Sequence, residues 1–303
     1  MDHVVQVSGG MGSYFASRRV IDKYGPDDVT LLFADVKMED EDLYRFLDDI
    51  EEDLGVPITR ISEGRDPWEV FKDVKYLGNT RIDPCSRVLK RDFLRDYMER
   101  NFDPDDTTVY IGIDWTEEHR FVKAKPRWEP WTLAAPLCEA PYLDKDSMRE
   151  ELERRGIAVP RLYEMGFPHN NCGGFCVKAG QAHFKILLEK MPERYAHHER
   201  KEQELREFLG KDVAVLRERS RPKIMARLGL TEDDVDKVIS VSDCCDDDQC
   251  DEQIETVVGY TIRATGEPLP KMLPKTFAML REEVESETDD TDPFDLGGCG
   301  CAL

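Results

Sequence analysis

The sequence predicts an α/β fold: a doubly wound, mostly parallel sheet followed by a helical part that contains cysteines. Two observations in residues 1–135 lead to this prediction. Apolar, partly β-branched runs of strand length alternate with segments whose apolar residues recur at helical spacing. The first run leads directly into a glycine-rich stretch that opens a helix-like segment, an arrangement typical of α/β sheets that bind ligands at the carboxyl ends of their strands.

Four strands and three helices are expected in this first part. The strand-like runs are residues 4–7, 29–33, 56–61 and 107–113. The run VTLLF at 29–33 is continuously apolar, as expected of a strand buried on both faces. Helical spacing of apolar residues marks 16–24, 43–54 and 89–97, and the clearest amphipathic pattern lies in 43–54.

Beyond residue 135 the pattern changes, and we divide the rest of the chain into three parts. Residues 136–219 form a helical region with the CGGFC motif, in which helices are expected over 145–155, 178–190 and 193–209. Residues 220–290 have weak periodicity and are interpreted as an acidic insertion. Residues 291–303 form a tail rich in glycine and cysteine.

Composition limits the classes of function. The 303 residues carry a formal net charge of −22, which repels nucleic-acid backbones at long range. This charge disfavours a broad nucleic-acid-binding face, although a local basic pocket is compatible with it. No stretch approaches eighteen consecutive apolar residues, and the N-terminal MDHVVQV lacks the pattern of a signal peptide. We expect a cytoplasmic protein with no membrane partner.

The stretch SGGMGS at residues 8–13 is the first candidate site. Its glycines permit positive φ angles and close approach of the backbone to a ligand. Successive N–H groups at the start of a helix form an anion site, and two serine hydroxyls add donors. The stretch fits neither GxxxxGK[ST] nor GxGxxG, and a tight turn that needs glycine only for its geometry is the alternative. The candidate binding residues are Ser8, Gly9, Gly10, Met11, Gly12 and Ser13.

A basic stripe and four carboxylates are further candidates. Arg87, Lys90, Arg91 and Arg95 recur at helical spacing, which suits contact with phosphate or sulfate, whereas pairing with Asp92 and Asp96 is the alternative. Asp35, Asp114, Glu117 and Glu118 offer the oxygen ligands that Mg²⁺ prefers, with helix capping or surface charge as the alternative. The candidate catalytic residues are Arg87, Lys90, Asp114 and Glu117.

Nine cysteines are many for a cytosolic chain, and their clustering favours metal or redox chemistry over disulfides. Cys172 and Cys176 in CGGFC have the spacing of metal ligands, and Cys85 begins the helix of the basic stripe. Zinc is one candidate metal, and ordinary buried cysteines are the alternative. The thiols of DCCDDDQC are expected in an exposed acidic loop, and Cys138 is expected to be packed.

SGGMGS also matches the SGGxxS signature of the PP-loop superfamily, which includes ATP pyrophosphatases, tRNA thiolases and phosphoadenylyl-sulfate (PAPS) reductases. FADVKMEDEDLYRF (33–46) resembles the PAPS reductase segment in which an acidic residue faces the nucleoside, here Asp35. PCSRVLKR (84–91) resembles their stretch near the substrate phosphates. GIDWTEEHR (112–120) resembles the region that closes their nucleotide site, which implies roles for Gly112 and Arg120.

The chain as a whole resembles proteins labelled PAPS reductase-like, which share NNCGGFCVKAGQAHF and a GGCGC tail. PAPS reductases proper carry a near-terminal ECG(I/L)H motif with the catalytic cysteine, and no such string occurs here. The resemblance implies a sheet of the HUP/PP-loop type, a bound adenine nucleotide (ATP or PAPS) with Mg²⁺, and attack at a phosphorus or sulfur centre.

The resemblance also implies a 4Fe–4S cluster as an alternative to Zn²⁺. The implied ligands are Cys85, Cys172 and Cys176, with Cys138, Cys299 or Cys301 as a fourth. Three functions stay open: sulfur or nucleotidyl transfer of the PAPS reductase-like class, an adenylating thiolase or amide ligase, and a non-catalytic nucleotide-sensing module stabilised by metal. The acceptor substrate is not identified by the sequence, and a homo-oligomer stays open.

Overall fold

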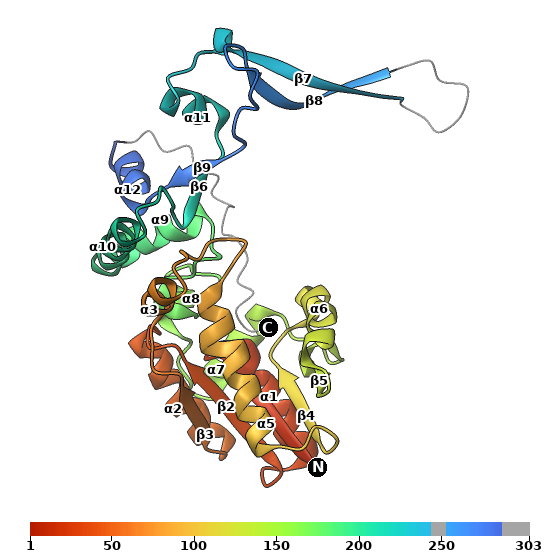
Figure 1. Ribbon diagram of the computed structural model, residues 1–303. Coiled ribbons are helices and arrows are strands. Elements are labelled where there is room, and N and C mark those ends of the chain that lie inside the picture. The colour runs from red at the N-terminus through yellow and green to blue at the C-terminus, as the bar shows by residue number, and fades with distance from the viewer. Residues whose placement is uncertain (244–252, 287–303) are drawn as a thin grey trace.

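The computed structural model describes residues 1–243 and 253–286, and its central feature is a parallel five-stranded sheet (Figure 1). The strand order is β3-β2-β1-β4-β5, and every neighbouring pair is parallel. The fold class predicted from the sequence is confirmed. The strands are β1 (Asp2–Val7), β2 (Val29–Asp35), β3 (Ile58–Ser62), β4 (Thr107–Ile111) and β5 (Thr132–Ala134).

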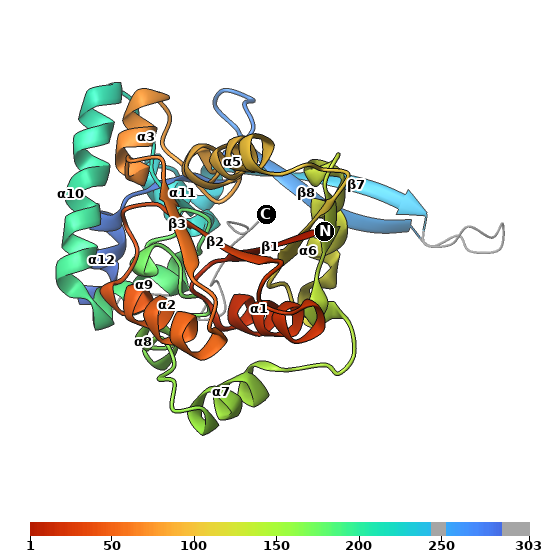
Figure 2. The same ribbon diagram turned by 90° about the horizontal axis from the view of Figure 1, so that it is seen from below.

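Helices cover both faces of this sheet. On one face, α1 (Met11–Tyr24), α2 (Glu41–Leu54) and α7 (Lys145–Arg154) share a core with the alternate strand residues Val5 and Leu31. On the other face, α5 (Phe93–Asn101) and α6 (Glu118–Trp128) pack on Val4, Leu32 and Ile111. Figure 2 shows α1, α2 and α7 on the side of the sheet opposite to α5. Successive strand residues point to opposite faces, which is why both faces need apolar residues.

The strand order creates a switch point beside β1. From β1 the chain moves first to β2 and β3 on one side and later to β4 and β5 on the other. The carboxyl ends of β1 and β4 are therefore neighbours, and the connections that follow them diverge. In open α/β sheets this crevice is where ligands bind.

A second core lies in the helical part of the chain. It joins α3 (Pro67–Asp73) to α8 (Arg161–Glu164), α9 (Gln181–Lys190), α10 (Pro192–Leu209) and α12 (Phe277–Glu285). Trp68, Phe175, Phe184 and Phe277 are buried in it, and their rings stack edge to face or tilted. The helices expected over 145–155, 178–190 and 193–209 correspond to α7, α9 and α10. Elements α3, α6 and β5 were not predicted from the sequence.

Residues 220–243 and 253–286, the described part of the acidic insertion, contain regular elements. They contain α11 (Arg221–Arg227), the antiparallel pair β7 (Val235–Asp243) and β8 (Gln253–Ile262), and β9 (Leu273–Lys275). Strand β9 pairs with β6 (Leu216–Glu218), and α12 packs in the second core. This region therefore leaves the helical part through α11 and the hairpin and returns to it. Most of DCCDDDQC, from residue 244 to 250, lies outside the described residues.

The remaining short elements are α4 (Pro84–Ser86), the π-helical turn η1 (Arg87–Asp92), and the 3₁₀ turns η2 (Trp115–Glu117), η3 (Pro136–Cys138), η4 (Cys172–Gly174) and η5 (Glu232–Asp234). Across the described part of the chain, we find no helix with the length and apolar character needed to cross a bilayer.

Candidate nucleotide site

A cavity of about 1180 Å³, counting its solvent-open part, lies at the carboxyl ends of β1 and β4. Its walls come from segments that are far apart in the sequence: residues 8–13, 90–94, 111–120 and 163–171. The predicted site residues in its lining are Ser8, Gly10, Met11, Gly12, Ser13, Lys90, Gly112, Asp114, Glu117 and Arg120. The fold thus brings together most of the residues that we selected from the sequence, at the place where α/β sheets bind ligands.

The glycine loop closes on itself through Ser13. The Ser13 hydroxyl donates to the carbonyl oxygen of Gly10 at 2.8 Å, and its oxygen accepts the N–H of Ser8 at 3.1 Å. Gly10 is the N-cap of α1, and no side chain caps this helix. Met11, Gly12 and Ser13, the first residues of α1, line the cavity at the positive end of the helix dipole, where an anion is stabilised.

Two glycines of the loop are required by the packing around them. Gly9 has a φ of 75°, and a Cβ placed on it would lie 2.6 Å from Leu43. A Cβ on Gly12 would lie 2.5 Å from the carbonyl oxygen of Gly112, and a Cβ on Gly112 would lie 2.5 Å from the backbone of Ser13. The loops that follow β1 and β4 therefore touch, backbone to backbone.

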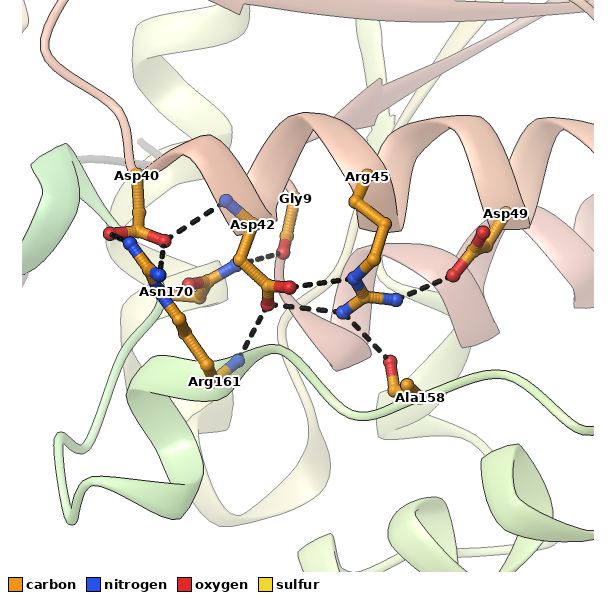
Figure 3. A network of polar contacts seen from close by, with 8 residues as sticks. All are labelled: Gly9, Asp40, Asp42, Arg45, Asp49, Ala158, Arg161 and Asn170. Atoms are coloured by element: carbon orange, nitrogen blue, oxygen red, sulfur yellow. Dashed lines mark hydrogen bonds and ion pairs between the residues drawn. The ribbon is translucent and has the colours of Figure 1, made fainter.

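Asn170 connects the helical part to the glycine loop. Its Nδ2 donates to the carbonyl oxygen of Gly9 at 2.8 Å, a contact drawn in Figure 3. Its side chain is buried in the cavity lining, and its Oδ1 has no hydrogen-bond partner within the described residues. A buried acceptor without a partner is costly, so Asn170 offers an oxygen to a donor group of a ligand in this cavity.

An ion-pair network holds the segment that carries Asn170 in place (Figure 3). Asp40, which is fully buried, accepts two hydrogen bonds from the Arg161 guanidinium at 2.7 and 2.8 Å. Asp42 accepts the backbone N–H of Arg161 at 2.7 Å, and its carboxylate also binds Arg45. The start of α2 and residues 158–171 are thereby fixed to each other beside the glycine loop.

The residues of the basic stripe lie partly in the cavity lining and partly in a neighbouring groove. Lys90 lines the cavity in the turn η1, and its Nζ lies 3.4 Å from the buried carboxylate of Glu39. Burial raises the pKa of Glu39, while the Lys90 ammonium acts in the opposite direction. Arg87 is not in the cavity lining: it is half-exposed, lies 4.0 Å from Asp92, and lines a neighbouring groove together with Arg95. Arg91 lines both hollows.

The carboxylates take different positions. Asp114 lies in the cavity lining and caps η2, because it accepts the N–H of Thr116 at 2.9 Å. Glu117 also lines the cavity and binds Arg120 at 2.5 Å. Asp35 ends β2 but is not in the lining; it accepts the hydroxyl of Tyr44 at 2.9 Å and the N–H of Lys37 at 2.8 Å. The cavity therefore offers two of the predicted carboxylates.

The cysteines of the proposed metal set are buried in the second core. Cys85, Cys172 and Cys176 all belong to it, and burial raises the pKa of the Cys85 thiol to about 12. Within residues 1–243 and 253–286, no group of three or more His, Cys, Asp or Glu side chains is arranged to hold a metal ion. Cys299 and Cys301 lie outside the described residues. Cys138 is partly buried, and its thiol donates to Ile113.

The CGGFC turn has an unusual backbone. Cys172, Gly173 and Gly174 have φ angles of 50°, 57° and 83°. The N–H of Cys172 donates to the buried carboxylate of Glu39, the partner of Lys90. A non-glycine residue in the left-handed region is uncommon, and such strain concentrates at functional sites. The turn is thus coupled to the cavity through Glu39.

Sequence reasoning missed several residues of the cavity lining: Trp128, Lys145, Tyr163, Asn170 and Asn171. His169, three residues before the first cysteine of CGGFC, also lines the cavity. The pair of asparagines before CGGFC was the available signal, since polar residues beside a special turn often serve a site. Residue spacing does not show that residues 163–171 approach the ends of β1 and β4, because this approach depends on tertiary contacts.

No family model matches the chain. An uncharacterised protein of Methanocaldococcus jannaschii is 26% identical over 173 residues, which are 56% of this chain and 35% of that protein. The chain thus spans about a third of the length of the curated relative it matches.

Two solved structures are similar over about half of the chain. One is PAPS reductase from Candida auris in its phosphate complex, with a TM-score of 0.39, 14% identity, and coverage of 55% of this chain and 79% of that one. The other is the U34-tRNA thiolase NcsA from Methanococcus maripaludis with its 4Fe–4S cluster, with a TM-score of 0.36, 16% identity, and coverage of 52% and 58%.

Proposed function

We propose that the cavity at the ends of β1 and β4 binds an adenine nucleotide, ATP or PAPS, as the substrate of a PP-loop-type enzyme. The observation that carries the proposal is the uncapped start of α1 inside a cavity that also contains Lys90 and Arg120. Phosphate groups need N–H donors and cationic side chains in one place, and this cavity provides both.

The unpartnered Oδ1 of Asn170 supports a ligand that has donor groups as well as phosphates. Ribose hydroxyls and the adenine amino group are such donors. The apolar residues Leu32, Leu94 and Met148 in the same lining provide surface for a base. A nucleotide satisfies all three parts of the cavity better than an inorganic anion does.

The chemistry follows from where charge develops. In attack at a phosphorus or sulfur centre, negative charge accumulates on the oxygens of the transferred group and of the leaving group. The N–H groups of the loop, with Lys90 and Arg120, are fixed beside that position and stabilise the charge without reorganising. Arg87 lies outside the cavity lining, so it would contact the ligand only if the ligand extends into the neighbouring groove.

Asp114 and Glu117 fit a Mg²⁺ ion that binds together with the nucleotide. Mg²⁺ is commonly held by one or two carboxylates plus substrate phosphates, and both side chains line the cavity. The ion would neutralise phosphate charge. The described cysteines do not fit an iron–sulfur cluster or zinc by themselves, so no step is derived through either. Iron, sulfide and zinc contents of protein purified without air test that part of the expectation.

Product analysis distinguishes the three functions that stay open. Release of sulfite from PAPS in the presence of a thiol reductant supports the PAPS reductase-like reaction. Release of pyrophosphate from ATP that depends on an added acceptor supports an adenylating thiolase or ligase. Tight nucleotide binding with no turnover under either condition supports a sensing module and contradicts an enzyme.

A further inference from the structure

A second hollow adjoins the nucleotide cavity and is strongly basic. It lies between the η1–α5 segment and α6, and eight basic but only two acidic side chains line it. The whole chain has a formal charge of −22, so this concentration of positive charge runs against the composition of the molecule. We name this hollow the basic groove.

The basic groove is built from two helices on one face of the sheet. Arg87, Arg91 and Arg95 recur every four residues on one wall, while α6 contributes Arg120, Lys123 and Arg127 to the other. Helices α5 and α6, which belong to the two walls, pack on the sheet in the same hydrophobic core. The cations are therefore presented by fixed elements, as a preformed binding surface requires.

Acidic side chains neutralise only part of this charge. Asp83 lies 3.1 Å from Arg91 and 3.9 Å from Lys178, and Asp92 is 4.0 Å from Arg87 with both side chains more than half exposed. Lys123 and Arg127 form no ion pair with any residue of the described part of the chain. Two neighbouring cations on one helix therefore have their charge available to a ligand.

The basic groove is continuous with the nucleotide cavity. Arg91, Arg120 and Trp128 line both hollows. The three cations of α6 span seven residues, or about 10 Å at 1.5 Å per residue, which corresponds to about three phosphates of one strand in a duplex. A ligand with a single phosphate would leave most of this wall unused.

We propose that the basic groove binds the sugar–phosphate backbone of a nucleic acid and so places it next to the nucleotide cavity as the acceptor. The second half of this statement rests on the proposed function; the binding itself does not. The charge of the rest of the molecule confines the contact to the groove, because repulsion at distances beyond about 8 Å is screened at physiological salt. Contact through phosphates alone makes the binding tolerant of sequence.

The test is fluorescence anisotropy with a labelled 12-nucleotide single strand, titrated with wild-type protein and with the double variant Lys123→Gln/Arg127→Gln. We expect the variant to bind at least tenfold more weakly, because each removed cation loses one charge-assisted phosphate contact. The slope of log K against log salt should become shallower by about 1.4, since each lost phosphate contact in a single strand removes about 0.7.

The matched control is Arg200→Gln/Lys211→Gln, which removes the same charge from α10 and from the loop after it, outside the groove. It should bind the strand within about twofold of wild type, because general charge alone has little effect at screened distances. Melting temperature and ATP affinity, measured for both variants, should match wild type, since none of these four residues lines the nucleotide cavity.

Three results would overturn the proposal: no binding of the strand by wild type, equal loss in the groove variant and its control, or competition showing that the groove takes inorganic pyrophosphate but no strand. A wild-type protein that binds the strand in a groove-dependent manner but binds neither ATP nor PAPS would instead contradict the proposed function. The two failures are therefore distinguishable.

Discussion

Glycines at the site serve different purposes at neighbouring positions. Gly9 and Gly12 are enclosed by Leu43 and by the backbone of Gly112, whereas Gly10 has an ordinary φ of −98° and faces the end of the Tyr163 side chain. The sequence shows three glycines in SGGMGS without this distinction. The structure assigns Gly9 and Gly12 to folding and leaves Gly10 as the position at which a larger residue would meet a ligand.

Replacement of Gly12 by alanine should destabilise the fold. The added Cβ would lie 2.5 Å from the Gly112 carbonyl oxygen, and neither backbone can yield without displacing the end of β4. We expect a loss of about 1–3 kcal/mol in the free energy of unfolding, the range for an overpacked site. Urea denaturation followed by circular dichroism measures it. Gly259→Ala, where a Cβ meets nothing within 4 Å, is the control, and equal stability of the two variants would refute this account of the loop contact.

At this scale the sequence identified the loop but not its partners. Spacing and residue type pointed to SGGMGS, to Lys90 and to the segment after β4. They also pointed to Asp35, which the structure places outside the cavity lining, where it binds Tyr44 and Lys37. They did not identify Asn170 as a partner of the loop, because its contact with Gly9 joins residues 161 positions apart.

At the scale of elements, the start of α2 fixes the position of the segment that carries Asn170. Asp40 caps this helix through the N–H of Asp42, and it also binds Arg161 from the segment that carries Asn170. Its carboxylate therefore connects an element of the parallel sheet domain to one of the helical part. Loss of this connection should loosen residues 158–171 and, through Asn170, the glycine loop.

Asp40→Ala should lower the free energy of unfolding by about 2–4 kcal/mol, since it removes a helix cap and leaves Arg161 without its buried partner. Asp49→Ala, on the same helix, removes an exposed ion pair with Arg45 and should cost less than about 1 kcal/mol. Hydrogen exchange of residues 158–171 should accelerate in the first variant and not in the second. Equal exchange in both would mean that Asp40 does not hold this segment.

The sequence predicted most elements of the sheet domain because each strand and helix has its own apolar period. It missed α6, whose interior contains Pro126 and whose apolar residues are few. The basic residues of α6 form a groove only because α6 packs in the same core as α5, which together with η1 carries the basic residues of the other wall. Local periodicity carries no information about such pairing of distant helices.

For the whole molecule, one buried carboxylate joins the segments of the helical part. Glu202 of α10 accepts the N–H of Val215 at 2.9 Å and the N–H of Phe277 at 2.8 Å. These donors stand before β6 and at the start of α12, which frame residues 220–290. The weak periodicity of that region did not reveal this return of the chain, since the return is made by tertiary contacts such as these and by the pairing of β6 with β9.

The stability of the protein should depend on pH through Glu202. Burial raises the pKa of this carboxyl to about 7, although the two N–H donors act in the opposite direction. A folded-state pKa above the unfolded one means that the native state holds the proton more tightly. Its contribution to stability is therefore complete below about pH 4.5 and is lost as the pH rises towards and through 7.

Melting temperatures measured from pH 5 to 8 check this prediction. Glu202→Gln should flatten the fall in stability over this range, whatever its absolute stability, because glutamine has no proton to lose. Glu204→Gln, an exposed position on the same helix, should keep the wild-type slope. If the slope of Glu202→Gln equals that of wild type, another group is responsible for the pH dependence.

The account as a whole depends on the claim that the glycine-loop cavity binds an adenine nucleotide, and calorimetric titration of ATP and PAPS into wild type and Gly10→Val tests it most directly. The backbone φ of −98° accepts valine, and the Cβ would lie 3.0 Å from the Tyr163 hydroxyl, so that side chain shifts slightly and the valine occupies the cavity beside the start of α1. We expect wild type to bind at least one of the two nucleotides and Gly10→Val to bind it at least about tenfold more weakly, because close approach of phosphate to the N–H groups is blocked. The melting temperature should change little. A folded Gly10→Val protein with undiminished affinity, or a wild type that binds neither nucleotide, would contradict the account.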